Sequence, residues 1–242
     1  MKQYTDIFID FDDTLYDTHG NAVIALRETF EYFDLGQYFD DPQVFYDDYW
    51  KTNIDLWGRY AKGEITRDYL IVERFRHPLC ASEVLRAKCE ESATAFRDFS
   101  LRVSDVFLDY CSSKPGLVEG ARELMDYLKQ QGYRLHMCSN GFHEVQYKKL
   151  AACGLKNHFD TIILSEDAGA NKPALEYFDY ALHTSGAKKE TTIMVGDNFQ
   201  TDILGAKHAG LDTIFFNRWP EYPATEPVTH EVNHLKDIIK IL

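Results

Sequence analysis

Short apolar runs recur along the chain between more polar stretches. Five runs are clear and a sixth is weaker; they cover residues 7–9, 135–138, 161–164, 192–195, 213–216 and 229–232. Runs that are apolar along most of their length, without strict alternation, are typical of strands buried on both faces of a parallel sheet. We therefore predict a parallel sheet built from these segments.

Between most of the runs, apolar residues repeat with the period of a helix. Two such helical faces are formed by Ala121, Leu124, Met125 and Leu128, and by Leu175, Phe178 and Leu182. Strands that alternate with helices form right-handed βαβ units. The predicted fold class is α/β, with a Rossmann-like parallel-sheet core.

Residues 18–111 have a different pattern, because they contain no convincing strand run. Aromatic residues stand there at helical spacings: Phe30, Phe33, Tyr46, Tyr49, Trp50, Trp57 and Tyr60. We interpret the segment as an inserted α-helical cap domain whose core holds most of these rings, with residues 1–17 and 112–242 as the catalytic core. The first strand ends near Asp10 and the second begins near Arg134, so the insert leaves the sheet at its carboxyl edge, where α/β folds bind ligands.

Charge and cysteine content narrow the function classes. The chain has 26 Lys and Arg against 39 Asp and Glu, a net charge of −13 that disfavours nucleic acid and anionic membrane surfaces as partners. It has five cysteines without a C-x-x-C pair, no apolar run of about 20 residues, and several aspartates near its start. We expect a cytoplasmic protein, monomeric or a small homo-oligomer.

The first candidate chemistry follows the first strand, in the segment Asp10, Phe11, Asp12, Asp13, Thr14. Alternation would put the Asp10 and Asp12 side chains on one side, where two carboxylates repel unless a cation or proton intervenes. In phosphoryl transfer one carboxylate can attack phosphorus while the other exchanges a proton with the leaving alcohol and then with water. The simpler alternative is a solvated, acid-rich turn.

A second acidic segment, residues 196–202, follows the fourth strand and contains Asp197 and Asp202. Carboxylate oxygens, water and substrate phosphate make up the octahedral shell that Mg²⁺ prefers. We take Asp10, the Asp12 backbone carbonyl and Asp197 as candidate ligands, with Asp202 as a further ligand or a support for the loop. Asp197 or Asn198 can equally act as a helix N-cap.

Two further elements supply groups for a phosphate. Ser139, Asn140 and Gly141 end the second strand, where a hydroxyl and backbone amides can approach a phosphoryl oxygen. Lys172 precedes a helix and can neutralise the transferring group while holding Asp10, although an exposed surface lysine is the ordinary alternative.

In this order, the four elements resemble the motifs of the haloacid dehalogenase superfamily, which match residues 10–14, Ser139, Lys172 and residues 196–202. The resemblance covers the whole α/β core. It implies an Mg²⁺-dependent phosphatase in which Asp10 forms an aspartyl-phosphate, Asp12 is the acid-base group, and Thr14 joins the phosphate-binding residues. Dehalogenating members lack the second acid of the first motif, so Asp12 favours phosphate esters.

The substrate and several alternatives stay open at this point. The element after Ser139, with Gln146 and Lys149, is similar to the pyrimidine 5'-nucleotidase branch, which implies a pyrimidine nucleoside 5'-monophosphate; sugar phosphates and other small metabolites are the alternative. A phosphonatase would need a Schiff-base lysine from the cap, for which Lys51, Lys62 and Lys88 are available. A receiver-like phospho-acceptor lacks both a cap and an acid in the position of Asp12, and a silent binding protein would have lost a key side chain.

Overall fold

The structure is a computed structural model and describes residues 4–219, 221 and 223–242. It divides into two compact units, one made of residues 1–19 and 114–242 and the other of residues 20–113. The helical insert predicted over residues 18–111 begins and ends two residues earlier than this second unit. The difference at the first boundary arises because helix α1 (Thr18–Tyr32) begins in one unit and continues into the other.

The first unit contains a six-stranded sheet with the order β3-β2-β1-β4-β5-β6, in which every neighbouring pair is parallel. The strands are β1 (Asp6–Ile9), β2 (Arg134–Ser139), β3 (Thr161–Leu164), β4 (Thr192–Gly196), β5 (Asp212–Phe216) and β6 (His230–Val232). All six predicted strands are present, including the weaker sixth.

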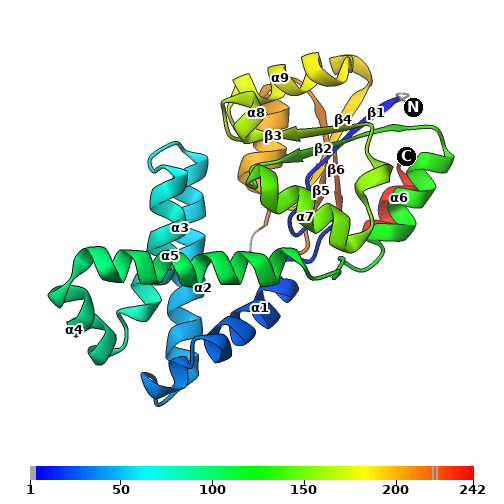
Figure 1. The fold of residues 1–242 in the computed structure, drawn as a ribbon. Helices are drawn as coiled ribbons and strands as arrows, with labels where there is room; N and C mark the ends of the chain where they lie inside the picture. Colours follow the sequence, from blue (N-terminus) through cyan, green and yellow to red (C-terminus); the bar gives the residue numbers. More distant parts are fainter. Residues whose placement is uncertain (1–3, 220, 222) are drawn as a thin grey trace. The chain divides into compact units, whose positions relative to one another are not determined.

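Helices cover both faces of this sheet (Figure 1). They are α6 (Ala121–Gln130), α7 (His143–Cys153), α8 (Ser165–Ala168), α9 (Leu175–Ser185) and α10 (Gly205–His208). Four short helical segments complete the unit: η2 (Lys156–His158), η3 (Lys189–Thr191), the π-helical η4 (Phe199–Leu204) and η5 (Leu235–Lys240). The predicted fold class, a Rossmann-like α/β core, is confirmed.

The alternation of strand side chains divides the core of this unit into two layers. Ile7 and Ile9 of β1 pack with α6 residues such as Leu124 and Leu128 in one cluster. Phe8, which lies between them, packs in the other cluster with Phe178 of α9. Continuous burial on both faces explains why the strands appear in the sequence as apolar runs.

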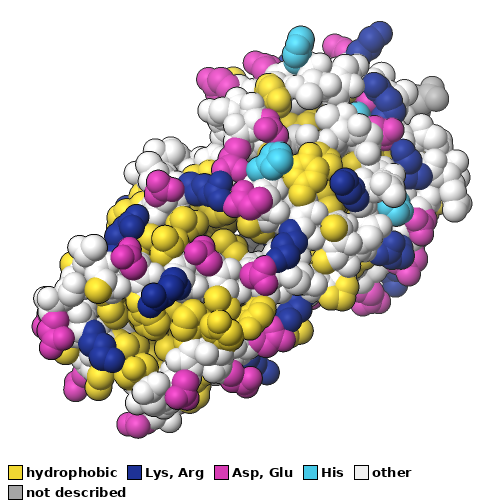
Figure 2. Space-filling view, in the orientation of Figure 1, with side chains coloured by type: hydrophobic (Ala, Val, Ile, Leu, Met, Phe, Trp, Pro, Cys, Tyr) yellow, Lys and Arg dark blue, Asp and Glu magenta, His cyan; other side chains and the backbone are white. Residues whose placement is uncertain are grey.

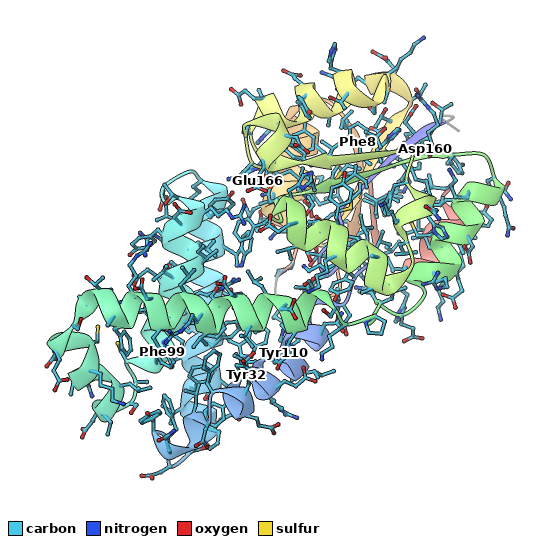
Figure 3. The ribbon with its side chains drawn as sticks, viewed as in Figure 1. Phe8, Tyr32, Phe99, Tyr110, Asp160 and Glu166 are labelled. Atoms are coloured by element: carbon cyan, nitrogen blue, oxygen red, sulfur yellow. The ribbon has the colours of Figure 1, made fainter. Side chains whose placement is uncertain are left out.

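The order of the strands indicates where in the sheet a ligand-binding site lies. From β1 the chain builds the sheet outward through β2 and β3, and β4 then returns to the other side of β1. Ligands bind at the carboxyl ends of the strands where the order reverses in this way. That edge is marked in Figure 3 by Glu166, which follows β3, whereas Asp160 precedes β3 at the opposite edge.

The second unit is helical throughout its regular structure. Besides most of α1 it contains η1 (Leu35–Gln37), α2 (Pro42–Ala61), α3 (Arg67–Leu79), α4 (Glu83–Glu91) and α5 (Ala93–Ser112). Several helices begin at a side-chain cap, as when the Ser92 hydroxyl accepts a hydrogen bond from the Ala95 N–H. None of the helices in the described part of the chain is long and apolar enough to cross a membrane.

Aromatic rings form much of the core of the helical unit. Phe45, Tyr49, Phe75 and Phe107 are buried, and the centroids of Phe75 and Phe107 lie 5.2 Å apart. A second group, in which Tyr32 lies 6.2 Å from Tyr110, is partly open to solvent (Figure 3). Figure 2 shows a broad field of hydrophobic side chains on this unit, between scattered acidic and basic ones.

The two chain segments that join the units run side by side within the first unit. The Tyr16 hydroxyl donates a hydrogen bond to the Lys114 carbonyl over 2.8 Å, and the Asp17 N–H donates to the Gly116 carbonyl over 3.1 Å. Tyr16 and Leu117 also form an isolated antiparallel bridge. The segment that leaves the sheet is therefore tied to the segment that returns to it.

Candidate active site

Acidic side chains from two strands meet at the carboxyl edge of the sheet. Asp10 follows β1, and its N–H donates to the Val195 carbonyl over 2.9 Å, which extends the β1–β4 pairing. Asp197 follows β4, and Asp202 lies in η4 directly after it. Oxygens from all three carboxylates lie within 4.8 Å of one another. The structure thus brings together three of the predicted site residues, and Asp10 and Asp202 are buried.

Lys172 provides the positive charge nearest to these acids. Its Nζ lies 2.7 Å from Asp10 Oδ1, 2.7 Å from Asp202 Oδ1 and 2.8 Å from the Cys138 carbonyl oxygen. Only 2% of Lys172 is exposed, which removes it from the class of ordinary surface lysines. Burial alone would lower the pKa of Lys172, but the two carboxylates outweigh that effect and hold it above its ordinary value.

A side-chain amide holds the backbone of Lys172 in place. The Asn140 Nδ2 donates to the Lys172 carbonyl over 2.9 Å, and the Asn140 Oδ1 accepts from the Lys172 N–H over 2.8 Å. The sequence pattern does not reveal this pairing with the Lys172 backbone, and the predicted role of Asn140 in phosphate binding stays a prediction.

Thr14 links Asp10 to Asp197. Its hydroxyl lies 3.0 Å from Asp10 Oδ2 and 3.1 Å from Asp197 Oδ1, and it accepts a hydrogen bond of 3.0 Å from the Asp197 N–H. Thr14 is fully buried. Its hydroxyl thus lies between the two carboxylates, and its predicted role in phosphate binding stays a prediction.

The acids outnumber the cations around Asp197. Burial raises the pKa of Asp197 well above its ordinary value, and Asp10, Asp202 and Asp13 raise it further by repulsion. Burial also raises the pKa of Asp10, in spite of the opposing charge of Lys172. A site that offers only oxygen donors and an excess of negative charge fits a divalent cation such as Mg²⁺.

Asp202 is paired with Lys172 and with the backbone of its own loop. Its Oδ1 pairs with Lys172, and its Oδ2 accepts a hydrogen bond of 3.1 Å from the Asn198 N–H. A Cβ at position 196 would lie 2.4 Å from Asp202 Oδ2, so only glycine fits there. Both carboxylate oxygens of Asp202 thus have partners, whereas Asn198 caps η4 by accepting from the N–H groups of Gln200 and Thr201.

Asp12 is held by side chains of α7 and by the first residue of α1. Its Oδ2 accepts a hydrogen bond of 2.5 Å from Gln146 Nε2, and its Oδ1 accepts one of 2.5 Å from the Thr18 hydroxyl. Lys149 forms an ion pair with the same carboxylate. Burial would raise the pKa of Asp12, but Lys149 and these hydrogen bonds lower it below its ordinary value.

Gln146 also connects Asp12 to the end of β2. Its Nε2 lies 2.5 Å from the Ser139 hydroxyl, which in turn accepts a hydrogen bond from the Gly141 N–H over 3.0 Å. A Cβ at position 141 would lie 2.2 Å from Gln146 Nε2, so this contact requires glycine. From the sequence, Gln146 and Lys149 stand out only through the family resemblance. The structure adds that both side chains contact Asp12.

The assembled groups are those that phosphoryl transfer requires. A buried carboxylate, Asp10, faces a lysine and further acids that can hold a cation, and a second carboxylate follows two residues later. Such a site can stabilise the charge of a transferring phosphoryl group and exchange protons with its oxygen substituents.

Comparison with known proteins agrees with this geometry. A family model described as haloacid dehalogenase-like hydrolase matches residues 7–210. The HAD-hydrolase YfnB of Bacillus subtilis is 32% identical over 100% of this chain and 97% of its own length. A crystal structure of YfnB bound to magnesium superimposes with a TM-score of 0.80 over 99% of both chains, at 30% identity.

Two relatives carry names of specific activities. The pyrimidine 5'-nucleotidase PynA of Streptococcus pneumoniae is 28% identical over 99% of this chain and 95% of its own. A glyceraldehyde 3-phosphate phosphatase of Methanothermobacter thermautotrophicus is 42% identical, with 87% of this chain and 84% of its own covered. The family match spans most of the sheet and all four motifs, and the chain belongs to the haloacid dehalogenase-like hydrolases.

Proposed function

We propose that this protein is an Mg²⁺-dependent phosphatase that hydrolyses small-molecule phosphate monoesters through an aspartyl-phosphate on Asp10. The observation that carries the proposal is the contact of Asp10 with Lys172 inside a buried acidic cluster. The phosphatase and nucleotidase names of the relatives support the same reaction class.

In the first half-reaction Asp10 attacks phosphorus, and the bond between phosphorus and the leaving oxygen breaks. The negative charge of a bound ester beside Asp12 opposes the lowering of its pKa by Lys149 and favours its protonated form. Asp12 then gives that proton to the leaving oxygen, so the alcohol departs neutral. In the second half-reaction Asp12 takes a proton from water, which attacks the aspartyl-phosphate and regenerates Asp10.

The surrounding residues hold the phosphoryl group during both steps. Lys172 neutralises its charge and keeps Asp10 in place, and the Ser139 hydroxyl and the Asn140 N–H would approach its oxygens. Asp10, the Asp12 carbonyl and Asp197 would hold Mg²⁺, which neutralises charge on the phosphoryl oxygens. Asp202, whose oxygens already have partners, would support Lys172 and the loop.

We further propose that the helical unit acts as a cap that recognises the leaving group. The magnesium-bound YfnB structure reveals interdomain movement, which supports a cap that opens and closes. Asn53, on α2, has a buried Oδ1 without a hydrogen-bond partner in the described structure, which suits an acceptor for a substrate donor. Arg59 is the second candidate on this helix; it already pairs with Asp55 at 3.7 Å.

Our leading substrate is a pyrimidine nucleoside 5'-monophosphate, since aromatic side chains of the helical unit can stack on a base. The similarity to PynA supports this choice. Small sugar or triose phosphates are the second candidate, and the similarity to glyceraldehyde 3-phosphate phosphatase favours them.

A substrate panel separates these possibilities. Phosphate release is measured with Mg²⁺ from uridine and thymidine monophosphates, purine nucleotides and sugar phosphates, with Asp10→Asn as the inactive control. Steady release that Asp10→Asn abolishes supports the phosphatase, whereas no release from any ester, or a single stoichiometric transfer, refutes it. If a sugar phosphate has a kcat/KM tenfold or more above the pyrimidine nucleotides, the nucleotidase choice is wrong and the phosphatase stands.

A further inference from the structure

Arg218 is a cation next to the site that none of the four motifs contains. It lies two residues after the end of β5, whereas the acids it contacts lie in the loop after β1. Its Nη1 is 3.0 Å from Asp13 Oδ1 and 3.2 Å from the Asp13 carbonyl oxygen. Its Nη2 is 2.5 Å from Asp17 Oδ1. One guanidinium therefore connects both ends of residues 13–17.

The guanidinium is itself fixed in place. Its Cζ lies 4.7 Å from the centre of the Trp219 ring, which lies 5.5 Å from the ring of His19. The His19 N–H closes the arrangement by donating to Asp13 Oδ1 over 2.9 Å. The side chain of Arg218 is only about one-fifth exposed, so the ion pairs are partly shielded from water.

Two features destabilise the observed conformation of the loop at residues 13–17, which Arg218 bridges. Asp13 has a φ of 61°, a left-handed conformation that costs energy for residues other than glycine, although aspartate adopts it more readily than most. Asp10, Asp12, Asp13 and Asp17 also carry like charges within eight consecutive positions. A cation that bridges Asp13 and Asp17 opposes both effects, because it stabilises the turn and offsets the repulsion.

The position of this loop determines where two site residues lie. Asp12 immediately precedes Asp13, and Thr14, which contacts Asp10 and Asp197, immediately follows it. A shift of Asp13 moves both neighbours. A misplacement of about 1 Å in a catalytic group can cost roughly 100-fold in rate.

We propose that Arg218 is a positioning residue that keeps Asp12 in place to protonate the leaving oxygen. The inference rests on the proposed function, in which Asp12 is the general acid. Arg218 itself touches neither substrate nor metal in this scheme. Lysine at this position would keep the charge, but its single ammonium cannot reproduce the planar fork that reaches Asp13 and Asp17 together.

The test uses two probes that differ in their need for a general acid. p-Nitrophenyl phosphate has a good leaving group, whereas ethyl phosphate needs a proton on its departing oxygen. For Arg218→Met we expect kcat/KM for ethyl phosphate to fall roughly 10- to 100-fold, with a clearly smaller loss for p-nitrophenyl phosphate. Arg218→Lys should lie between wild type and Arg218→Met.

Two controls make the result specific. Lys240→Met removes an exposed ion pair of 2.6 Å with Asp237 in the same unit, and should leave both rates unchanged. Asp17→Ala should reproduce part of the loss, and adding it to Arg218→Met should cost little more, because the two changes remove the same contact. Asp17→Ala also provides the test if Arg218→Met does not fold.

The possible outcomes are distinct. An equal loss on both probes, or additive losses for Arg218→Met and Asp17→Ala, would show that Arg218 does not act through Asp12. Unchanged rates in every variant would overturn the inference and leave the phosphatase intact. A wild-type protein that hydrolyses neither these probes nor any ester of the substrate panel would overturn the proposed function, and this inference with it.

Discussion

Lys172 Nζ lies 2.7 Å from Asp10 Oδ1 although 162 positions separate the two residues in the chain. The same Nζ lies 2.7 Å from Asp202 Oδ1, so two buried carboxylates share this lysine. The contact gives the lysine a structural role besides its proposed catalytic one, because the acids would be left buried and without a counter-charge in its absence.

Replacing Lys172 with Met should therefore lower both activity and stability. We expect kcat to fall by roughly 100- to 1,000-fold, the loss typical of removing a group that stabilises the transition state. The free energy of unfolding should fall by about 3 to 5 kcal/mol, as for a broken buried ion pair. Urea unfolding and phosphate release measure the two effects. A variant with wild-type turnover would contradict the assignment of Lys172.

Asp12→Asn should impair turnover with little change in fold, because asparagine keeps the shape but can neither give nor take the proton. General acid-base help is typically worth about 100- to 10,000-fold, so a loss in that range is expected. Phosphate release from an alkyl phosphate measures it, and a thermal melt checks folding. Rates equal to wild type would remove Asp12 from the proton transfers.

Metal removal should stop the reaction. In excess chelator the acids around Asp197 face a phosphate dianion with Lys172 as the main opposing charge, which cannot offset all of them. Activity should disappear and return when Mg²⁺ is added. Undiminished turnover in chelator would exclude the metal from the mechanism.

Asp197→Ala and Asp202→Ala should differ in their response to Mg²⁺. Asp197→Ala removes a proposed ligand, and a much higher Mg²⁺ concentration should be needed for half-maximal activity. Asp202→Ala removes a partner of Lys172 instead, so kcat should fall while the Mg²⁺ requirement changes less. Mg²⁺ titrations of both variants decide the matter, and equal Mg²⁺ dependence of wild type and Asp197→Ala would contradict it.

Low pH should lower the stability of the fold through Asp6 and His136, which lie away from the candidate active site. Burial would raise the pKa of Asp6, but hydrogen bonds from His136, Thr5 and Arg134 hold it below its ordinary value. Burial lowers the pKa of His136 in spite of Asp6. The unfolded chain thus binds protons more readily at both groups, and stability should fall as the pH drops from about 6.5, the ordinary pKa of histidine, through the lower pKa of Asp6.

The measurement is the urea midpoint between neutral pH and pH values near 4, for wild type and His136→Gln. His136→Gln removes the group that titrates in the upper part of this pH range. The urea midpoint of the variant should therefore depend less on pH there than that of wild type. Parallel curves for the two proteins would show that His136 does not contribute to the pH dependence.

The strands of the sheet could be predicted from the sequence because they are buried on both faces and therefore form apolar runs. The run at 161–164 coincides with β3, and the run at 7–9 differs from β1 by one residue, Asp6. Asp6 was missed because a carboxylate does not look like a strand residue; its partners on β2 become visible only when the strands are paired.

The main acids of the site were also predictable, because parallel strands end at a common edge and each acid directly follows a strand. Contacts between side chains of different loops could not be predicted from the sequence. The pairing of Asn140 with the Lys172 backbone, and that of Arg218 with Asp13, join segments whose approach depends on the conformation of each loop. No local period in the sequence encodes such contacts.

The paired segments at Tyr16 and Leu117 have a consequence for how this chain can be altered. The segments that leave and re-enter the first unit are hydrogen-bonded to each other within that unit. Residues 20–113 are therefore an insertion between two neighbouring positions of its backbone. Insertions of this kind can be shortened, lengthened or replaced by an unrelated domain with little effect on the host. If the helical unit recognises the leaving group as proposed, the phosphate chemistry and the choice of substrate can evolve, and be engineered, as separate parts of one gene.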